Sequence, residues 1–343
     1  MMHNADRAVL RIGAGTAVAT LVCFASALPM PHLGCIMAWI VLCQGKPLPL
    51  KKGIVIGCVL SVTMVGGVLM VPLLTYYALP AVLLTALLLY QLMVMGLSGK
   101  ATLSMLLVVA VAIIPVAGLV DQALAIGLAQ MLGIGFITGT LVNGLAVALF
   151  PPLPQPASAP PVPPLPTVSA VHARALRAVI IVLPVWLLAL SHPTFYIPAV
   201  MKTVMLAQQA TTLESKTSGR ELVLSTLLGA LLALGLWFGL SLWPSLLMLV
   251  LWLGLASLWV ARRLVRLSAS RFPPSFWSNV WITALILFGP AIQDSASGKD
   301  VWTAAAMRCA LYIIIALYGW ACIALLERWR PLPSPSTAPH PGE

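Results

Sequence analysis

Apolar segments long enough to cross a bilayer follow one another through almost the whole of this 343-residue chain. A membrane-spanning helix needs about 20 consecutive, mostly apolar residues. The chain is 61% hydrophobic and only 8% charged, whereas soluble domains carry about 25% charged residues. Little of the chain is left for a soluble catalytic domain. The sequence therefore predicts an all-α integral membrane protein that crosses the bilayer many times.

A proline-rich segment divides the chain into two parts of similar length. Residues 150–173 contain nine prolines and no acid, lysine or arginine. Because proline lacks a backbone donor and fixes φ, this segment should be an extended, solvated spacer. We expect four parts, which are a first six-span repeat (1–150), a cytoplasmic linker (151–173), a second six-span repeat (174–330) and a disordered Pro/Ser-rich tail (331–343).

Twelve spans are expected, with both termini in the cytoplasm. They cover residues 8–28, 33–45, 53–74, 78–97, 102–120 and 122–150, then 175–191, 194–210, 221–242, 244–261, 276–292 and 301–327. In this topology all 19 lysines and arginines except Lys202, Lys299 and Arg308 fall in cytoplasmic segments. An excess of basic residues on the cytoplasmic side is the expected asymmetry. A shift of the frame by one span would destroy it.

The two halves repeat the same order of features. Each opens with a basic helix, followed by a Pro-containing corner and a short second span. Each closes with an aspartate, Asp121 or Asp300, just before a long final helix. Since six spans per half give both halves the same orientation, the repeat is expected to be parallel.

The second span of each half is unusually short and begins at a His/Pro corner. Residues 33–44 are barely long enough to cross a bilayer, and residues 194–209 contain both Pro198 and Lys202. Short or proline-interrupted spans at matching positions of two halves point to a transport site.

Lys202 is the strongest candidate for a residue of the substrate path. A lysine near mid-span costs roughly 2.5–3.5 kcal/mol on insertion scales, so it is expected to face a polar cavity or a partner. Pro198 precedes it by one turn and Gln209 follows it by two, so the three share a helix face that would present a positive charge to an anionic substrate. The alternative is that Lys202 snorkels toward an interface.

Arg308, near the start of the last span, is expected either to neutralise Asp294 or Asp300 or to line the same path as Lys202. Asp121, Asp294 and Asp300 are the acids on the outer side, which makes them candidate proton or gate groups. The alternative for Asp121 and Asp300 is a helix N-cap that offsets the helix dipole.

His32 and His192 lie at the two outer corners. A histidine at the mouth of a path can take up and release protons near neutral pH. The alternative is that both are turn residues beside proline.

Several classes of function find no support in the sequence. The net charge of +11 follows the loops between spans and not a nucleic-acid-binding patch. The six cysteines all fall in apolar segments without a CxxC pair, so we expect neither disulfides nor a metal site. No nucleotide-binding loop, hydrolase motif or metal-ligand cluster is present in the sequence. We therefore expect no enzyme, no catalytic residues and no cofactor.

Two motifs resemble the fusaric acid resistance / aromatic acid exporter superfamily. They are the basic loop that leads into a glycine-marked span (Thr217–Leu222 with Leu228-Gly229-Ala230) and the Arg-bearing final helix (Met307–Ala310 with Tyr318-Gly319). The resemblance implies export of aromatic or other weak organic acids, often beside a periplasmic adaptor of the membrane-fusion type in Gram-negative bacteria. Plant malate channels are similar, with two six-span subunits around a basic pore, which would make Lys202 a pore-lining cation. The large cytoplasmic domains of the long exporters are missing from this chain.

The leading expectation is therefore a bacterial inner-membrane efflux permease for small organic anions, coupled to protons. Lys202 would attract the carboxylate and Arg308 would assist. The alternatives are a passive organic-anion channel and a membrane subunit of a larger export assembly that transports nothing itself. The expected partners are the anionic substrate, the bilayer and an adaptor protein, with a homo-oligomer also compatible with the pattern.

Overall fold

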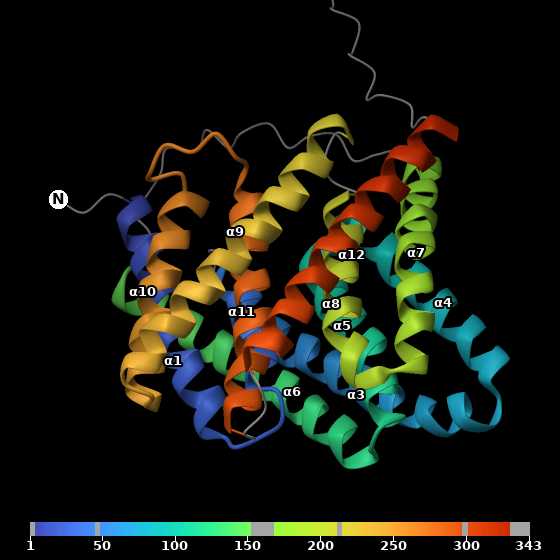
Figure 1. Cartoon of the computed structure of the whole chain (residues 1–343), viewed down its shortest axis with the longest axis horizontal. Helices are drawn as coiled ribbons and strands as arrows, with labels where there is room; N and C mark the ends of the chain where they lie inside the picture. The colour runs from blue at the N-terminus through green and yellow to red at the C-terminus, as the bar shows by residue number, and fades with distance from the viewer. Residues whose placement is uncertain (1–3, 45–48, 152–167, 211–214, 297–300, 330–343) are drawn as a thin grey trace, which may run out of the picture.

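The computed structural model describes residues 4–44, 49–151, 168–210, 215–296 and 301–329, and every regular element in these ranges is a helix (Figure 1). The first six α-helices are α1 (Asn4–Ala25), α2 (Pro31–Leu42), α3 (Leu50–Tyr76), α4 (Ala78–Met95), α5 (Ala101–Gly118) and α6 (Gln122–Leu149). The next six are α7 (Val168–Ser191), α8 (Pro193–Ala210), α9 (Ser215–Leu242), α10 (Leu246–Leu264), α11 (Pro274–Ala296) and α12 (Val301–Trp329). Each expected span overlaps one of these helices.

The protein is an all-α, multi-pass membrane protein. Within the described ranges, nine helices are long and apolar enough to cross a bilayer, and α2 and residues 103–118 of α5 form shorter apolar helices. The outward side chains of α3 are apolar as well, and Val62 and Leu69 are among the most exposed, at 72% and 68%. Exposed apolar surface of this extent would promote association in water, whereas lipid solvates it.

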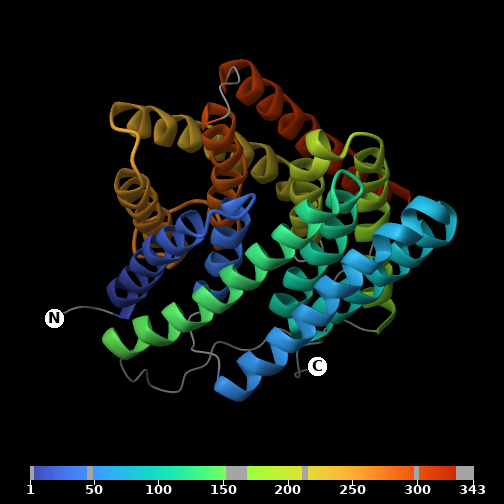
Figure 2. The ribbon, with the colours of Figure 1, turned by 90° about the horizontal axis from the view of Figure 1, so that it is seen from below.

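Four helices, α2, α5, α8 and α11, form the interior. All twelve residues of α2 are buried, and α5 is buried continuously from Leu106 to Ala117. Neither stretch carries a charge, and a helix that is apolar on all sides is stable only when other helices surround it. The remaining eight helices lie around this interior (Figures 1 and 2).

Contacts between the two halves occur in reciprocal pairs. Helix α1 packs against α10 at one edge of the molecule, and α4 packs against α7 at the opposite edge (Figure 1). In the interior α2 packs against α11, and α5 packs against α8. The long helices α3 and α6 lie on one face and α9 and α12 on the other (Figure 2). Exchanging each helix of the first half with the helix six places later in the second half, such as α1 with α7 and α4 with α10, thus converts one contact of each pair into its counterpart.

Close approach of α2 to α6 depends on glycine. A Cβ atom added to Gly135 would lie 2.6 Å from the Cα atom of Gly34, a distance that real Cβ atoms do not tolerate. The two backbones therefore meet without an intervening side chain. Small residues of this kind are the usual means of close helix packing in membranes.

One helix boundary differs from the sequence prediction. Helix α7 begins at Val168, inside the expected linker 151–173, because no proline follows Pro166 until Pro184 and nothing prevents the chain from becoming helical. The segment η1 (Gly96–Lys100) joins α4 to α5 through a kink with non-helical backbone at Ser98 and Gly99, and this break overlaps the one expected between the spans 78–97 and 102–120. Gly99 has φ of 99° there, which glycine adopts without steric cost. The greater part of the linker and the tail 331–343 lie outside the described residues.

Candidate functional site

Lys202 lies in the interior of the protein with its side chain fully buried. Its ammonium group donates to the Oδ1 atom of Asn279 at 3.0 Å and to the Oγ1 atom of Thr283 at 2.5 Å. Both acceptors lie on α11, and Lys202 lies on α8. The side chain therefore reaches toward the neighbouring helix, which is inconsistent with the snorkelling alternative.

The hydrogen bonds around Lys202 continue to a third helix. The Nδ2 atom of Asn279 donates to the Oγ atom of Ser225 on α9 at 2.5 Å. The Thr283 hydroxyl donates to the backbone oxygen of Asn279 at 2.7 Å, one turn earlier on α11. All of these side chains are buried. We refer to Lys202, Asn279, Thr283 and Ser225 as the lysine cluster.

The oxygens that surround the Lys202 ammonium group are all neutral. In the described part of the chain no carboxylate lies within ion-pair distance of Lys202. The ion pair that this part of the chain does contain joins Arg308 to Asp294. A buried ammonium group without a counter-ion is costly in hydrocarbon. An anion that replaced one of the neutral oxygens would therefore gain a strong charge-assisted hydrogen bond.

Pro198 and Gln209, which the sequence placed on the same face as Lys202, both belong to α8. The positions of their side chains lie outside what the structure describes. Their share in a substrate path therefore stays a prediction.

Arg308 forms an ion pair that joins α12 to α11. Its Nη1 atom lies 2.5 Å from the Oδ2 atom of Asp294, and the two side chains are 21% and 12% exposed. Of the two acids expected near Arg308, the structure thus brings Asp294 to it. Asp300 lies outside the described residues. The pair is near the end of α11 and the start of α12, which is the outer side in the expected topology.

His32 and Tyr312 lie close to this ion pair. Both side chains are buried, and Tyr312 follows Arg308 by one turn of α12. Within the described ranges, the Nδ1 atom of His32 and the hydroxyl of Tyr312 have no hydrogen-bond partner. The His32 ring occupies the space that a side chain at Gly289 of α11 would need. We refer to Arg308, Asp294, His32 and Tyr312 as the outer cluster.

The two corner histidines are not equivalent in the structure. His32 is in the first turn of α2 and buried, whereas His192 is exposed between α7 and α8. The backbone oxygen of His192 accepts hydrogen bonds from the backbone nitrogens of Phe195 and Tyr196, at 3.2 and 3.1 Å. His192 thus has the geometry of a turn residue.

Asp121 caps helix α6. Its Oδ1 atom accepts a hydrogen bond from the backbone nitrogen of Ala123 at 3.0 Å. This is the usual geometry of an N-cap residue. The capping alternative for Asp121 is therefore correct as a description of its contacts.

Two tryptophans meet where α2 and α11 pack together. The ring centroids of Trp39 and Trp281 are 5.2 Å apart, with 38° between the ring planes. Both side chains are buried, and within the described ranges neither indole nitrogen has a hydrogen-bond partner. The pair offers an aromatic surface and two unused donors next to α11.

Sequence reasoning missed Asn279, Thr283, Ser225 and Tyr312. Asn279 carries a usable signal, because it is an amide within an otherwise apolar span and such side chains seek partners across helices. The hydroxyl residues give a weaker signal, since serine and threonine often bond to their own helix. No group of three or more His, Cys, Asp or Glu side chains that would hold a metal ion occurs in the described ranges.

A family described as a protein of unknown function (DUF2955) matches residues 8–150 of the chain. This region contains helices α1 to α6 and ends just before the proline-rich segment. The match covers less than half of the chain. No curated protein and no solved structure matches the chain.

Proposed function

We propose that this chain is an inner-membrane permease that exports small aromatic or amphipathic organic anions, coupled to protons. The observation that carries the proposal is the fully buried Lys202 ammonium group, whose partners among the described residues are neutral oxygens. Membrane proteins rarely keep a lysine at such depth without a transport role. The lysine cluster supplies a positive charge on the side of α11 that packs against α8 and α9. The aromatic pair lies on the opposite side of α11, because Trp281 is two residues from both Asn279 and Thr283.

In the proposed mechanism the substrate carboxylate takes the place of Asn279 or Thr283 at the Lys202 ammonium group. The anion then moves to Arg308, where it competes with the carboxylate of Asp294. Once displaced from Arg308, Asp294 takes up a proton from the outer side, and His32 offers a further acceptor beside it. After the anion is released outward, Asp294 gives up its proton toward the cytoplasmic side, so that one proton moves inward for each anion exported, and Asp294 pairs with Arg308 again.

We further propose that the chain consists of two parallel six-helix repeats, with twelve spans and both termini in the cytoplasm of a bacterium. The reciprocal pairs of helix contacts support the repeat. The end of the family match at residue 150 supports the boundary between the halves. The distribution of basic residues supports the orientation. A periplasmic membrane-fusion adaptor and membership of the fusaric acid resistance superfamily rest on the resemblance of the two motifs alone.

A passive organic-anion channel is the second candidate. The lysine cluster favours it because the described residues place no carboxylate beside Lys202, so proton coupling depends on the separate outer cluster. Voltage-driven anion flux through the purified protein, without a proton gradient, would identify a channel. Proton-coupled export requires that dissipating the proton gradient abolish uphill transport.

The test compares cells that lack the protein with cells that carry the wild type or Lys202→Met. Methionine matches the length of lysine and avoids the cavity that alanine would leave. Each strain is challenged with a panel of aromatic and aliphatic weak acids, and intracellular acid is measured. The matched control is Thr203→Val, because Thr203 is also buried on α8 but its hydroxyl bonds only to the backbone oxygen of Ala199 in its own helix.

We expect the null strain to be sensitive to some acids and to be rescued by the wild type and Thr203→Val but not by Lys202→Met. Membrane fractionation and gel filtration check that each variant is inserted and monodisperse. Export by Lys202→Met at the wild-type rate would refute the role of Lys202. If no acid in the panel affects the null strain differently from the wild type, the export function is refuted and the chain is better explained as a non-transporting subunit of an export assembly.

A further inference from the structure

Helices α3 and α5 touch at one end and separate at the other. Near the outer end a Cβ atom on Gly67 would lie 3.1 Å from side-chain atoms of Ile114. Toward the opposite end α3 packs on α6 instead, where a Cβ on Gly57 would lie 3.6 Å from the Phe136 ring. There α5 is held to α4 by a hydrogen bond from the Ser104 hydroxyl to a backbone oxygen of α4, at 2.6 Å. The two helices therefore enclose a V-shaped gap.

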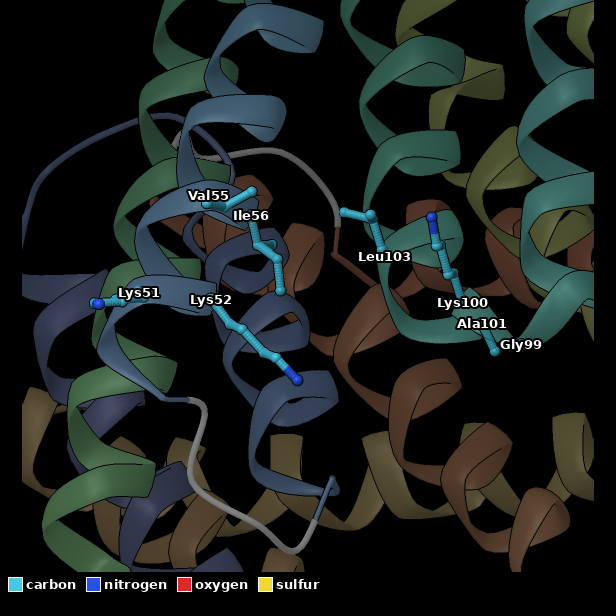
Figure 3. Close-up of a pocket in the computed structure, with 8 residues that line it drawn as sticks. All are labelled: Lys51, Lys52, Val55, Ile56, Gly99, Lys100, Ala101 and Leu103. Atoms are coloured by element: carbon cyan, nitrogen blue, oxygen red, sulfur yellow. The ribbon is translucent and has the colours of Figure 1, made fainter. Parts of the chain in front are cut away.

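The open end of this gap contains a cavity of about 580 Å³ (Figure 3). Lys52 at the start of α3 and Lys100 at the start of α5 come from opposite sides of the gap, and Val55, Ile56 and Leu103 line its walls. Lys51 also borders the cavity, but its side chain extends away from the gap (Figure 3). None of the described residues that line the cavity is acidic.

The cavity has the chemistry of a site for an amphiphile with an anionic head. Lys52 and Lys100 border the cavity from its two sides, and the walls between them are apolar, so one molecule can contact both a positive charge and an apolar surface. The wall residue Val55 is 61% exposed and continues into the lipid-facing side of α3. In the proposed topology the cavity thus opens sideways toward the bilayer, at the level where the heads of amphiphilic anions lie in the cytoplasmic leaflet.

We propose that this cavity is a lateral loading site that takes anionic amphiphiles from the cytoplasmic leaflet. The carboxylate or phosphate lies between Lys52 and Lys100, and the apolar part of the molecule lies against Val55, Ile56 and Leu103. Two sources share this chemistry, namely the amphipathic acids that the protein would export and the anionic phospholipids of the leaflet. The loading role rests on the proposed export function, whereas binding to the cavity does not.

An excess of basic residues on the cytoplasmic side does not by itself explain this arrangement. The positive-inside rule requires only that lysines lie in cytoplasmic segments, and Lys51 satisfies it as well as Lys52 does. The rule does not require that lysines from two different loops flank one apolar cavity. The comparison of Lys51 with Lys52 and Lys100 therefore separates the site from general topology.

The experiment uses the full-length protein in nanodiscs of neutral phosphatidylcholine, with pyrenebutyrate as the anionic probe and pyrenebutanol as its uncharged counterpart. Binding is measured by pyrene fluorescence for the wild type, Lys52→Gln/Lys100→Gln and the control Lys51→Gln. Each lysine near the membrane surface is expected to contribute about fivefold in affinity, and the pair about thirtyfold. All three lysines are exposed, and gel filtration verifies that each variant is folded.

We expect the double variant to bind pyrenebutyrate roughly thirtyfold more weakly, Lys51→Gln to change the affinity by less than about threefold, and pyrenebutanol to bind all proteins alike. Equal binding by the wild type and the double variant overturns the proposal, as does a loss of equal size in Lys51→Gln. In a second arm, phosphatidylglycerol is added to the nanodiscs. Competition that needs Lys52 and Lys100 supports the site and identifies phospholipid as a source.

Export by the same variants separates this proposal from the function proposed above. If Lys202→Met abolishes export but binds pyrenebutyrate like the wild type, and the double variant loses that binding, both proposals stand. If the double variant retains wild-type binding while Lys202→Met loses export, the loading site is refuted and the export function is not. If Lys202→Met exports normally but the double variant loses binding, the site remains as a phospholipid site and the export mechanism fails.

Discussion

Asn279→Ala is expected to destabilise the protein strongly, and the size of the effect should depend on whether Lys202 is present. The substitution removes one of the two hydrogen-bond acceptors of the buried ammonium group. A hydrogen bond to a charged group contributes about 1.5–3 kcal/mol. Ser225 loses the donor that Asn279 provides, which adds about 1 kcal/mol. The expected cost in the wild-type background is therefore about 3 kcal/mol.

In the Lys202→Met background the same substitution should be mild. No ammonium group remains to be satisfied, so only the bond to Ser225 is lost, at about 1 kcal/mol. Lys202→Met alone should change the stability little, because loss of the charge removes its desolvation cost while leaving Asn279 without a donor. The double-mutant cycle should thus yield a coupling of about 2 kcal/mol.

The cycle is measured by unfolding the purified protein in detergent and following tryptophan fluorescence. Asn143→Ala serves as the control, because Asn143 is a buried amide on α6 and not a member of the lysine cluster. Its effect should be the same with and without Lys202. Additivity of Asn279→Ala and Lys202→Met to within about 0.5 kcal/mol would show that the two side chains do not depend on each other, which refutes the reasoning.

Three further predictions concern other parts of the molecule. Asp121→Asn should retain full transport and nearly full stability, because asparagine caps helices as well as aspartate; loss of transport would indicate a proton role. Gly135→Ala should destabilise the protein by about 1–3 kcal/mol because α2 and α6 are forced apart. Gly133→Ala should not destabilise it, because position 133 has open space around it. Thermal unfolding of both variants would verify the difference. Arg308→Asp should abolish proton-coupled transport measured in proteoliposomes, and adding Asp294→Arg should restore part of it by re-forming the ion pair; failure of the double variant with an intact fold would argue against gating by that pair.

Much of the architecture could be predicted from the sequence because it depends on local patterns. Apolar length, prolines and basic loops determine where helices begin and end, so each expected span overlaps a helix. The start of α7 at Val168 was missed, because composition defined the linker and a proline-free stretch at its end was included in it. The break before α5 lies between the expected spans 78–97 and 102–120, but its geometry could not be predicted, since Gly99 is compatible with several kinds of turn.

The candidate site was harder to predict because its partners are far apart in the chain. Lys202 is conspicuous on its own, but a sequence does not say which residues will contact it. His32 shows the same difficulty, because a histidine beside a proline reads as a turn residue, whereas the packing of α2 against α11 buries it. Tyr312 could have been placed near Arg308 from the sequence, because it follows Arg308 by one turn of the same helix, but nothing in the sequence indicates that it is buried.

The lysine cluster also has a consequence for the order of events during biosynthesis. The hydrogen-bond partner of Lys202 is 77 residues later in the chain. At about 5–20 residues per second, α11 leaves the ribosome roughly 4–15 s after α8. During that interval the ammonium group has to be hydrated or held by the insertion machinery, because hydrocarbon alone would not retain it. Helix α8 should therefore insert stably into the bilayer only when α11 arrives. The second half should then assemble around a helix whose own hydrophobicity is not sufficient to hold it in the membrane.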